Sequence, residues 1–592
     1  MKTRKHIGLL LVFLFTGNSL FSQNNAPNTQ QKDSIKTEVV EVVTSYTPKI
    51  SDAFKLQQHP SVKRVGKSTK KNIQYRITPS TVVSTFIPKK GALKMIDLGR
   101  KELLYKNYIA VGYGNYNAPF LETFIRYNTR FENDFGVYAR YQSANKNTPN
   151  SLLESGYSNI QTNLYYQQEE RYLDWEIRLN SQREQYNWYG VSPDFFQQAT
   201  LDAIDEAQTY NFIETIGSIQ LKESFINQAN ITTSYFTDLY GSKEYHSKLT
   251  TELQLPLTFI SNQWQDIFLD ISVDYLAGKF RASYFESNPL QHAFLNFSVQ
   301  PRYQFNIQKT VIRLGAKMYY TSDLEHAITQ FYGYPDVRVS IPIHKEHVTM
   351  YLGATGDLHT NSFRAFSQKN PYISPTLYNT QTNEMYRFFT GFHGKISQNI
   401  AYNLKVSYSN EEDKALFTRQ TSKSDGTSTS FEETPFLGYE YGNSFAVHYD
   451  DVKTTAVFAE IEVEPLKDLI FGGNLHYHHY QTKTAEAAWN LPVFKGSLFG
   501  AYKGNKWYAG TDVYFVGNRT ERSFLSTPQV LDSTKKLNSY IDINLNGGYH
   551  FNDKLAVFVK LNNLLNKNYQ RFTDIESQGL QVLGGATFKF DF

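Results

Sequence analysis

Cysteine is absent from the 592 residues of this chain, which excludes a disulfide scaffold and a thiol nucleophile. The chain also lacks any stretch near the roughly 18 consecutive apolar residues that a membrane-spanning helix needs. The sequence patterns of serine-hydrolase elbows, zinc proteases and phosphate-binding loops are missing as well. We therefore expect no helical membrane span, no enzyme activity and no cofactor.

The N-terminus has the pattern of a secretory signal. Lys2, Arg4 and Lys5 precede the apolar run of residues 7–15, and small polar residues follow. This order of basic, apolar and cleavable segments is typical of a signal peptide. We predict a signal peptide over residues 1–22, cleaved after Ser22, and hence export from the cytoplasm. With no cysteine after the apolar run, acylation as a lipoprotein is excluded.

Aromatic residues are abundant, with 43 Tyr and 43 Phe, although the mean hydropathy is only −0.48. Both features fit a membrane β-barrel, in which an apolar lipid-facing side alternates with a polar lumen side and aromatic girdles mark the interfaces. Residues 109–114 and 135–142 show the alternation of period two that places successive side chains on opposite faces. The sequence therefore predicts strands that cross a membrane.

The breaks between these alternating runs are short and long in turn. The long breaks fall near residues 187–208, 277–291, 357–384, 411–451 and 519–535. Outer-membrane barrels have short periplasmic turns and long surface loops. Counting the alternating runs, with short and long breaks taken in turn, predicts an all-β, transmembrane antiparallel barrel of about 22 strands over residues 106–592. A soluble propeller or tandem sandwich would show a fixed repeat or domain-sized blocks, and neither is found.

The C-terminal segment resembles a known family. Residues 559–569 contain Asn563, Leu564, Asn566, Lys567 and Tyr569, which is similar to the N-L-x-[DN]-K-x-Y segment near the end of TonB-dependent receptors. The chain then ends on alternating aromatic residues that resemble the signal read by the outer-membrane barrel-assembly machinery, namely Phe588, Phe590 and Phe592. The resemblance implies an outer-membrane location in a Gram-negative cell, surrounded by lipids and lipopolysaccharide.

An N-terminal segment resembles the TonB box, through which such receptors are pulled by TonB. It consists of Glu38, Val39, Val40, Glu41, Val42, Val43 and Thr44. A β-branched run of this kind is able to add a strand to the edge of a partner's sheet. The segment that follows, up to Lys106, is too short for the globular plug of the family. We therefore predict a plug-less variant, with residues 23–105 as a periplasmic tail.

The tail is basic. Residues 24–105 hold 15 Lys and Arg against 6 Asp and Glu, whereas the rest of the chain from Lys106 is net acidic. Several of the basic residues form one patch, consisting of Lys63, Arg64, Lys67, Lys70 and Lys71. Such a tail is able to lie against an acidic lumen, to dock on a periplasmic partner or to serve as a solvated linker. A lumen of this size must be closed by surface loops, by the tail or by a partner.

His476 and His478 share one face of a predicted strand and are weak candidates for metal ligands, without an identifiable third ligand. The alternative is an interfacial belt near the barrel mouth. Nucleic-acid binding is not expected, because the chain is exported and its basic stretch lacks interleaved aromatics.

Two functions remain open from the sequence. The favoured hypothesis is a barrel subunit of a multi-protein outer-membrane complex for barrel assembly, protein secretion or surface-lipoprotein export. It rests on the missing gating domain and on a tail suited to docking. The alternative is a TonB-linked or passive transporter for a solute, with loops near 357–384 and 411–451 as gate and selector.

Overall fold

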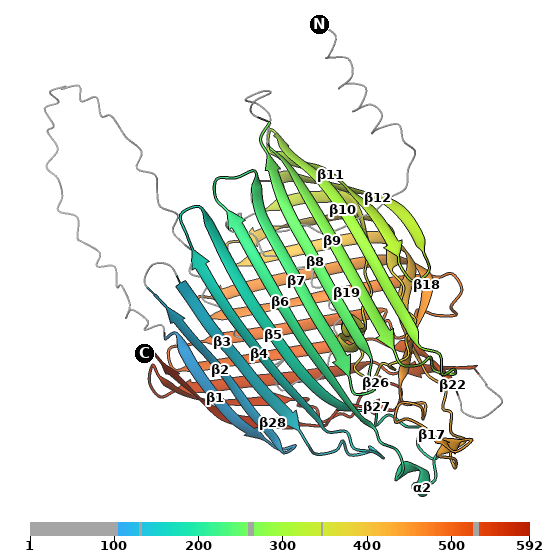
Figure 1. Ribbon diagram of the computed structural model, residues 1–592. Coiled ribbons are helices and arrows are strands. Elements are labelled where there is room, and N and C mark those ends of the chain that lie inside the picture. Colours follow the sequence, from blue (N-terminus) through green and yellow to red (C-terminus); the bar gives the residue numbers. More distant parts are fainter. Residues whose placement is uncertain (1–104, 130–132, 258–265, 345–346, 525–531) are drawn as a thin grey trace, which may run out of the picture.

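A closed, antiparallel β-barrel makes up the computed structural model (Figure 1), which describes residues 105–129, 133–257, 266–344, 347–524 and 532–592. Its sheet has 22 strands, and β1 pairs with β28 to close it. The predicted fold class and strand number are therefore confirmed. The signal peptide, the TonB-box-like segment and the basic patch lie within residues 1–104, outside the described residues, and they stay predictions.

Strand length varies around the barrel, from 8 residues in β1 to 22 in β18. The barrel strands are β1 (Asn107–Gly114), β2 (Ala118–Asn128), β3 (Asn133–Ala144), β4 (Tyr157–Glu169), β5 (Leu173–Asn187), β6 (Ala207–Leu221), β7 (Ile226–Asp238), β8 (Lys243–Leu255), β9 (Ile267–Phe280), β10 (Leu290–Ile307), β11 (Thr310–Asp323), β12 (Ile328–His344), β13 (Val348–His359), β14 (Thr382–Ser397), β15 (Ile400–Arg419), β18 (Phe445–Leu466), β19 (Leu469–Thr482), β20 (Phe494–Lys503), β21 (Trp507–Val516), β24 (Tyr540–His550), β25 (Leu555–Asn562) and β28 (Gln581–Phe590).

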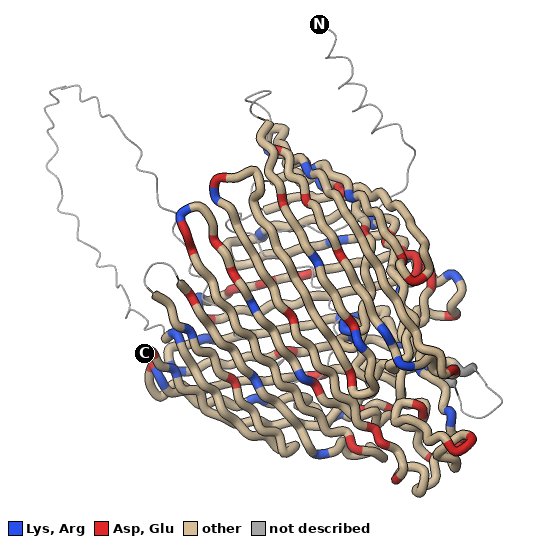
Figure 2. Tube along the Cα trace, viewed as in Figure 1, with Lys and Arg blue, Asp and Glu red and all other residues tan. Residues whose placement is uncertain are grey.

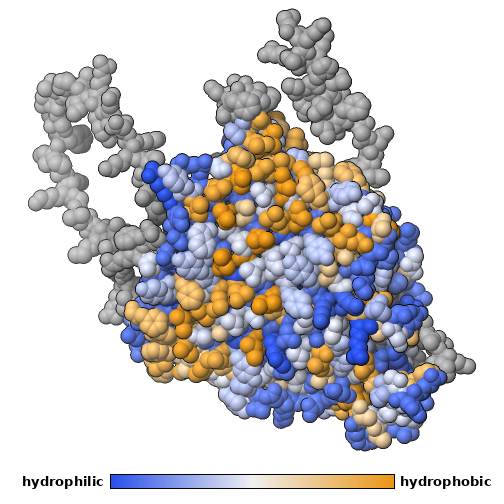
Figure 3. Space-filling view, in the orientation of Figure 1, coloured by the Kyte–Doolittle hydropathy of each residue, from blue (hydrophilic) through white to orange (hydrophobic). Residues whose placement is uncertain are grey.

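Alternation along each strand separates the two faces of the wall. On β11, Leu314 and Tyr320 are 39% and 53% exposed and face outward, whereas Lys317 between them is only 3% exposed and faces inward. Apolar residues cover much of the wall seen in Figure 3. Charged residues are spread over strands and loops (Figure 2). This arrangement is expected where lipid surrounds the wall and water fills the lumen.

The long loops lie at one end of the barrel and most connections at the other end are short turns, as the sequence predicted, although connections 115–117, 239–242 and 324–327 at the loop end have only three or four residues. Turns such as 308–309 and 398–399 have two residues, whereas loops such as 188–206 and 360–381 are long. Both ends of the barrel chain lie at the end with short turns, because β1 starts there and β28 finishes there. By the rule for outer-membrane barrels, this end faces the periplasm and the loop end faces the cell surface.

The loops carry the remaining secondary structure. No helix in the described part of the chain is long and apolar enough to cross a membrane. The five predicted long loops are present, but loops 145–156, 483–493 and 563–580 are also long and were not predicted as such. The loop elements are α2 (Gln198–Leu201), α3 (Phe363–Lys369), β16 (Ser430–Phe431), β17 (Thr434–Pro435), β22 (Arg519–Phe524), β23 (Asp532–Leu537), β26 (Gln570–Phe572) and β27 (Ile575–Glu576).

Candidate functional site: a loop cap over the barrel lumen

Loops from strands all around the barrel fold inward and pack on one another at the cell-surface end. Their contacts form a shared apolar core that includes Tyr189, Tyr441, Phe445 and Phe572, all less than 9% exposed. We call this assembly the loop cap, and it consists of residues 145–156, 188–206, 360–381, 420–444 and 563–580. Because its members belong to strands far apart in the sheet, the loop cap covers the lumen.

The loop 360–381 carries α3 into the lumen from between β13 and β14. Ser362 caps this helix, since its side chain accepts a hydrogen bond from the backbone N–H of Ala365 at 3.0 Å. Arg364, on the first turn, forms an ion pair with Glu184 of β5 at 3.0 Å. Glu244 of β8 accepts hydrogen bonds from the backbone N–H groups of Phe363 and Arg364. The helix is thus fixed by buried carboxylates of β5 and β8.

Aromatic packing supports the same position of α3. The ring of Phe363 lies 5.2 Å from those of Phe236 and Phe280, centroid to centroid, and 5.9 Å from Tyr210. Further along the loop, the backbone N–H of Ser374 donates to the carbonyl of Phe445 at 2.7 Å. The loop therefore contacts β6, β7 and β9 at one end and the start of β18 at the other, which means that it spans the lumen.

The loops 188–206 and 420–444 approach each other backbone to backbone. The N–H of Gln197 donates to the carbonyl of Gly426 at 2.9 Å, and Gly426 has a φ of +93° that favours glycine. At a second point, a Cβ on Gly438 would lie 1.6 Å from the carbonyl oxygen of Asp205. Only glycine fits such a contact, so the sequence encodes the close approach of these two loops.

Arg419, at the end of β15, joins three loops through its guanidinium. Its Nη1 pairs with Asp574 at 2.5 Å, its Nη2 donates to the carbonyl of Gly190 at 2.7 Å, and its Nε donates to the carbonyl of Gly442. Lys535 adds a second ion pair to Asp574 at 3.0 Å. Burial raises the pKa of the Asp574 carboxyl, but the charges of Arg419 and Lys535 outweigh burial and hold the pKa below its usual value. The carboxylate is therefore ionised and paired at neutral pH.

The hairpin of β22 and β23 holds the loop 563–580 from its other side. Arg519 donates to the backbone carbonyls of Gln570 and Arg571. Glu521 is fully buried and accepts a hydrogen bond from the backbone N–H of Thr573 at 3.1 Å. Burial raises the pKa of the Glu521 carboxyl. Arg519 and Glu521 therefore hold the same loop, 563–580, that Arg419 and Lys535 contact through Asp574.

The segment that resembles the TonB-dependent receptors forms a structured turn in the loop cap. Asn563 is 1% exposed and has a φ of +50°, and its amide donates to the carbonyls of Lys567 and Gln578 at 2.7 and 2.8 Å. The ring of Tyr569 stacks on Tyr540 with centroids 4.0 Å apart. The residues of this motif therefore shape the end of β25 and the start of the last loop.

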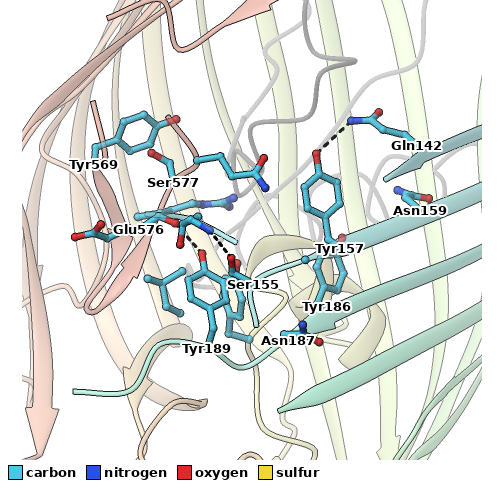
Figure 4. Close-up of a pocket in the computed structure, with 16 residues that line it drawn as sticks. Gln142, Ser155, Tyr157, Asn159, Tyr186, Asn187, Tyr189, Tyr569, Glu576 and Ser577 are labelled. Carbon is cyan, nitrogen blue, oxygen red and sulfur yellow. Dashed lines mark hydrogen bonds between the residues drawn. The ribbon is translucent and has the colours of Figure 1, made fainter. Parts of the chain in front are cut away.

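A small cavity lies between the loop cap and the inner wall of the barrel. A cavity of about 60 Å³ lies among Tyr157, Tyr186, Tyr189 and Tyr569, whose side chains gather around it in Figure 4. Ligand pockets typically have roughly 300–1,000 Å³, so this cavity suits a few water molecules. A larger solute does not fit this cavity unless the surrounding loops move.

The lumen wall below the loop cap is polar and charged. Arg302 of β10 pairs with Glu252 and Asp270 at 2.7 and 2.8 Å. On the neighbouring strands, Lys317 pairs with Asp357 at 2.8 Å. A wall of paired charges is suited to a water-filled path, because charged groups are costly to bury without water or partners.

The remaining candidates from the sequence lie elsewhere on the barrel. His476 and His478 share the lumen face of β19 and stack with ring centroids 6.0 Å apart. Within the described residues no group of three potential metal-ligating side chains is found. Phe588 of β28 is 48% exposed and faces outward, where Phe590 stacks beside it. Its expected recognition by the assembly machinery stays a prediction.

The residues that build the loop cap were not identified from the sequence. Arg364, Arg419 and Asp574 belong to no local motif, and Arg419 is 155 residues away from Asp574. The one local signal in the sequence is the presence of Gly426 and Gly438 in a long polar loop. These glycines indicate that the backbone turns tightly or packs closely there, but they do not indicate which segment it contacts.

Comparison with known proteins identifies solved structures that have a similar barrel. No family model and no curated protein matches the sequence. Among solved structures, the pyoverdine outer membrane receptor FpvA from Pseudomonas aeruginosa has 12% identity and a TM-score of 0.59, over 83% of this chain and 79% of FpvA. The ferric enterobactin receptor PfeA from the same organism has 9% identity and a TM-score of 0.58, over 83% and 81%. The FrpB iron transporter from Neisseria meningitidis has 9% identity and a TM-score of 0.59, over 83% and 82%.

These similarities show the fold. The chain has the barrel architecture of the TonB-dependent receptors, as the C-terminal motif implied. The three proteins are described as receptors and transporters. The predicted loss of the plug concerns residues outside the described ranges and stays a prediction.

Proposed function

We propose that the chain is a gated outer-membrane transporter, in which the lumen is the path and the loop cap is the gate. The observation that carries this proposal is the loop 360–381, which crosses the lumen and is held by Glu184 of β5 and Glu244 of β8. A path lined by charged pairs lies below it. A lid across a polar channel is the arrangement that controlled passage of a solute requires.

The solute class we propose is a small iron chelate. The similar structures include receptors described as bound to pyoverdine and enterobactin, and an iron transporter. The loop cap adds Tyr189, Tyr372, Tyr569 and Arg571 around its cavity, and aromatic and guanidinium groups suit anionic chelates with flat rings. We further propose that residues 1–22 are a cleaved signal and that Glu38–Thr44 contacts TonB, whose pull supplies the energy.

The hypothesis of a barrel subunit in a multi-protein complex is less well supported. It depended on the missing plug and on the basic tail, which lie outside the described residues. The comparisons support receptors and transporters of solutes instead. The transporter hypothesis, the alternative that the sequence left open, is therefore the better supported function.

Uptake of labelled iron tests the proposal in cells that carry the chain with an engineered lock. Ile373 and Phe445 pair through their backbones, and the chain has no other cysteine, so the double variant Ile373→Cys/Phe445→Cys is expected to fix the loop to the wall when oxidised. We expect iron supplied as catecholate or hydroxamate chelates to enter only when this lock is reduced. Each single cysteine variant serves as the control and should be insensitive to oxidation.

Two outcomes would contradict the proposal. Uptake that continues through the oxidised double variant would show that the loop cap is not the gate. An intact chain that raises uptake of none of the chelates would remove the proposed solute class. Deletion of Glu38–Thr44 should abolish uptake without changing the amount of barrel, and unchanged uptake would instead indicate passive passage.

A further inference from the structure

A groove of about 710 Å³ lies at the cell-surface end of β21 and β24. Phe515 and Ile541 line it and are cross-strand partners. Ile541 is 41% exposed, whereas its neighbour Asp542 is fully buried on the opposite face of the strand. Because the exposed face of a barrel strand is the lipid face, Phe515 and Ile541 place one side of the groove on the outer wall of the barrel. Its other side is formed by residues 567–570 and Glu576 of the loop cap.

The groove has an excess of positive charge. Among the residues that the structure describes, Lys535, Lys536 and Lys567 line it together with one carboxylate, that of Glu576. Lys535 is paired with Asp574. Lys536 and Lys567 are exposed, and neither has an ion pair among the residues that the structure describes. Lys536 and Lys567 therefore have no carboxylate as an ion-pair partner within the described residues. Both face the groove at the end of the strands, where the apolar outer wall of the barrel ends.

This combination fits a phosphorylated lipid better than a soluble anion. The loop end of the barrel faces the cell surface, and clustered lysines beside a membrane attract anionic headgroups. Phe515 and Ile541 provide apolar surface for acyl chains directly below the lysines, which free phosphate would not use. We propose that this groove binds the phosphorylated glycolipid of the outer leaflet, with Lys536 and Lys567 holding a phosphate. Lipid binding here does not rest on the proposed transport function, although Lys567 belongs to loop 563–580 of the loop cap.

Native mass spectrometry of the full chain in detergent, titrated with lipid A, tests the site. We expect Lys536→Gln/Lys567→Gln to weaken binding of lipid A about tenfold, in line with the loss of two lysines near an anionic headgroup. Lys503→Gln/Lys506→Gln is the matched control, because it removes two exposed lysines from the periplasmic end of β20 and β21. This control should bind like the unaltered chain.

The same titration with two other probes identifies the source of the phosphate. Lipid A without its phosphates should bind the unaltered chain about tenfold more weakly, and inorganic phosphate should not compete at equal concentration. The proposal is wrong if the two double variants bind lipid A equally, if the phosphate-free lipid binds as tightly, or if inorganic phosphate displaces the lipid. Retention of the compact barrel band on unheated gels shows that each variant is folded.

Discussion

At the scale of single residues, the loop cap depends on Arg419, which contacts three loops at once. Replacing Arg419 with Ala leaves the buried carboxylate of Asp574 with Lys535 as its one ion-pair partner in the described chain. Removing one partner of a buried ion pair costs about 3–5 kcal/mol. We expect Arg419→Ala to speed proteolysis of residues 420–444 in the folded barrel, with Arg183→Ala, an exposed site on β5, as the control. Equal proteolysis of both variants would show that this ion pair does not hold the loop cap.

Residues of this kind were beyond sequence analysis for a physical reason. The partners Arg364 and Glu184 are separated by 180 residues, and nothing local distinguishes them from other charges on amphipathic strands. The motif around Asn563 was visible because its hydrogen bonds are local, within about 15 residues along the chain. Sequence reasoning thus found the residues that shape a turn and missed those that join distant loops.

At the scale of elements, the close contact between two loops gives a sharp prediction. A Cβ at Gly438 would overlap the carbonyl oxygen of Asp205, so Gly438→Ala must push loops 188–206 and 420–444 apart. Overpacking of this kind costs about 1–3 kcal/mol. We expect faster hydrogen exchange in both loops, whereas Gly584→Ala on β28, where nothing lies within 4 Å of the added atom, should leave exchange unchanged. Slower or unaltered exchange in the Gly438→Ala variant would show that the loops do not meet as described.

The strands were predictable because their pattern has a physical origin that acts at every crossing. Lipid on one side and water on the other impose alternation, and the membrane thickness fixes a minimum length. The loops have no such common constraint. Loop 563–580 was not recognised as long because its start contains Leu564 and Leu565, which resemble the continuation of a strand.

At the scale of the whole molecule, the barrel and the loop cap are separable. Every barrel strand is paired on both sides, including the closing pair of β1 and β28, so the wall satisfies its backbone hydrogen bonds without the loops. The loop cap adds contacts within itself and to the inner wall. Its removal is therefore expected to change permeability more than the stability of the barrel.

Deletion of residues 362–379 tests this separation directly. His359 and Thr382 pair across β13 and β14, so a short Gly-Ser turn is able to join the two strand ends without strain. We expect the shortened barrel to run as a compact, heat-modifiable band like the full chain but to conduct ions in planar bilayers, where the full chain is closed. If the shortened barrel stays closed, the loop cap is not the barrier, and a second deletion of residues 23–105 distinguishes closure by the basic tail from closure by the remaining loops. A tail that blocks the lumen opens the pore on deletion, whereas a pore that stays closed without the tail is closed by the remaining loops.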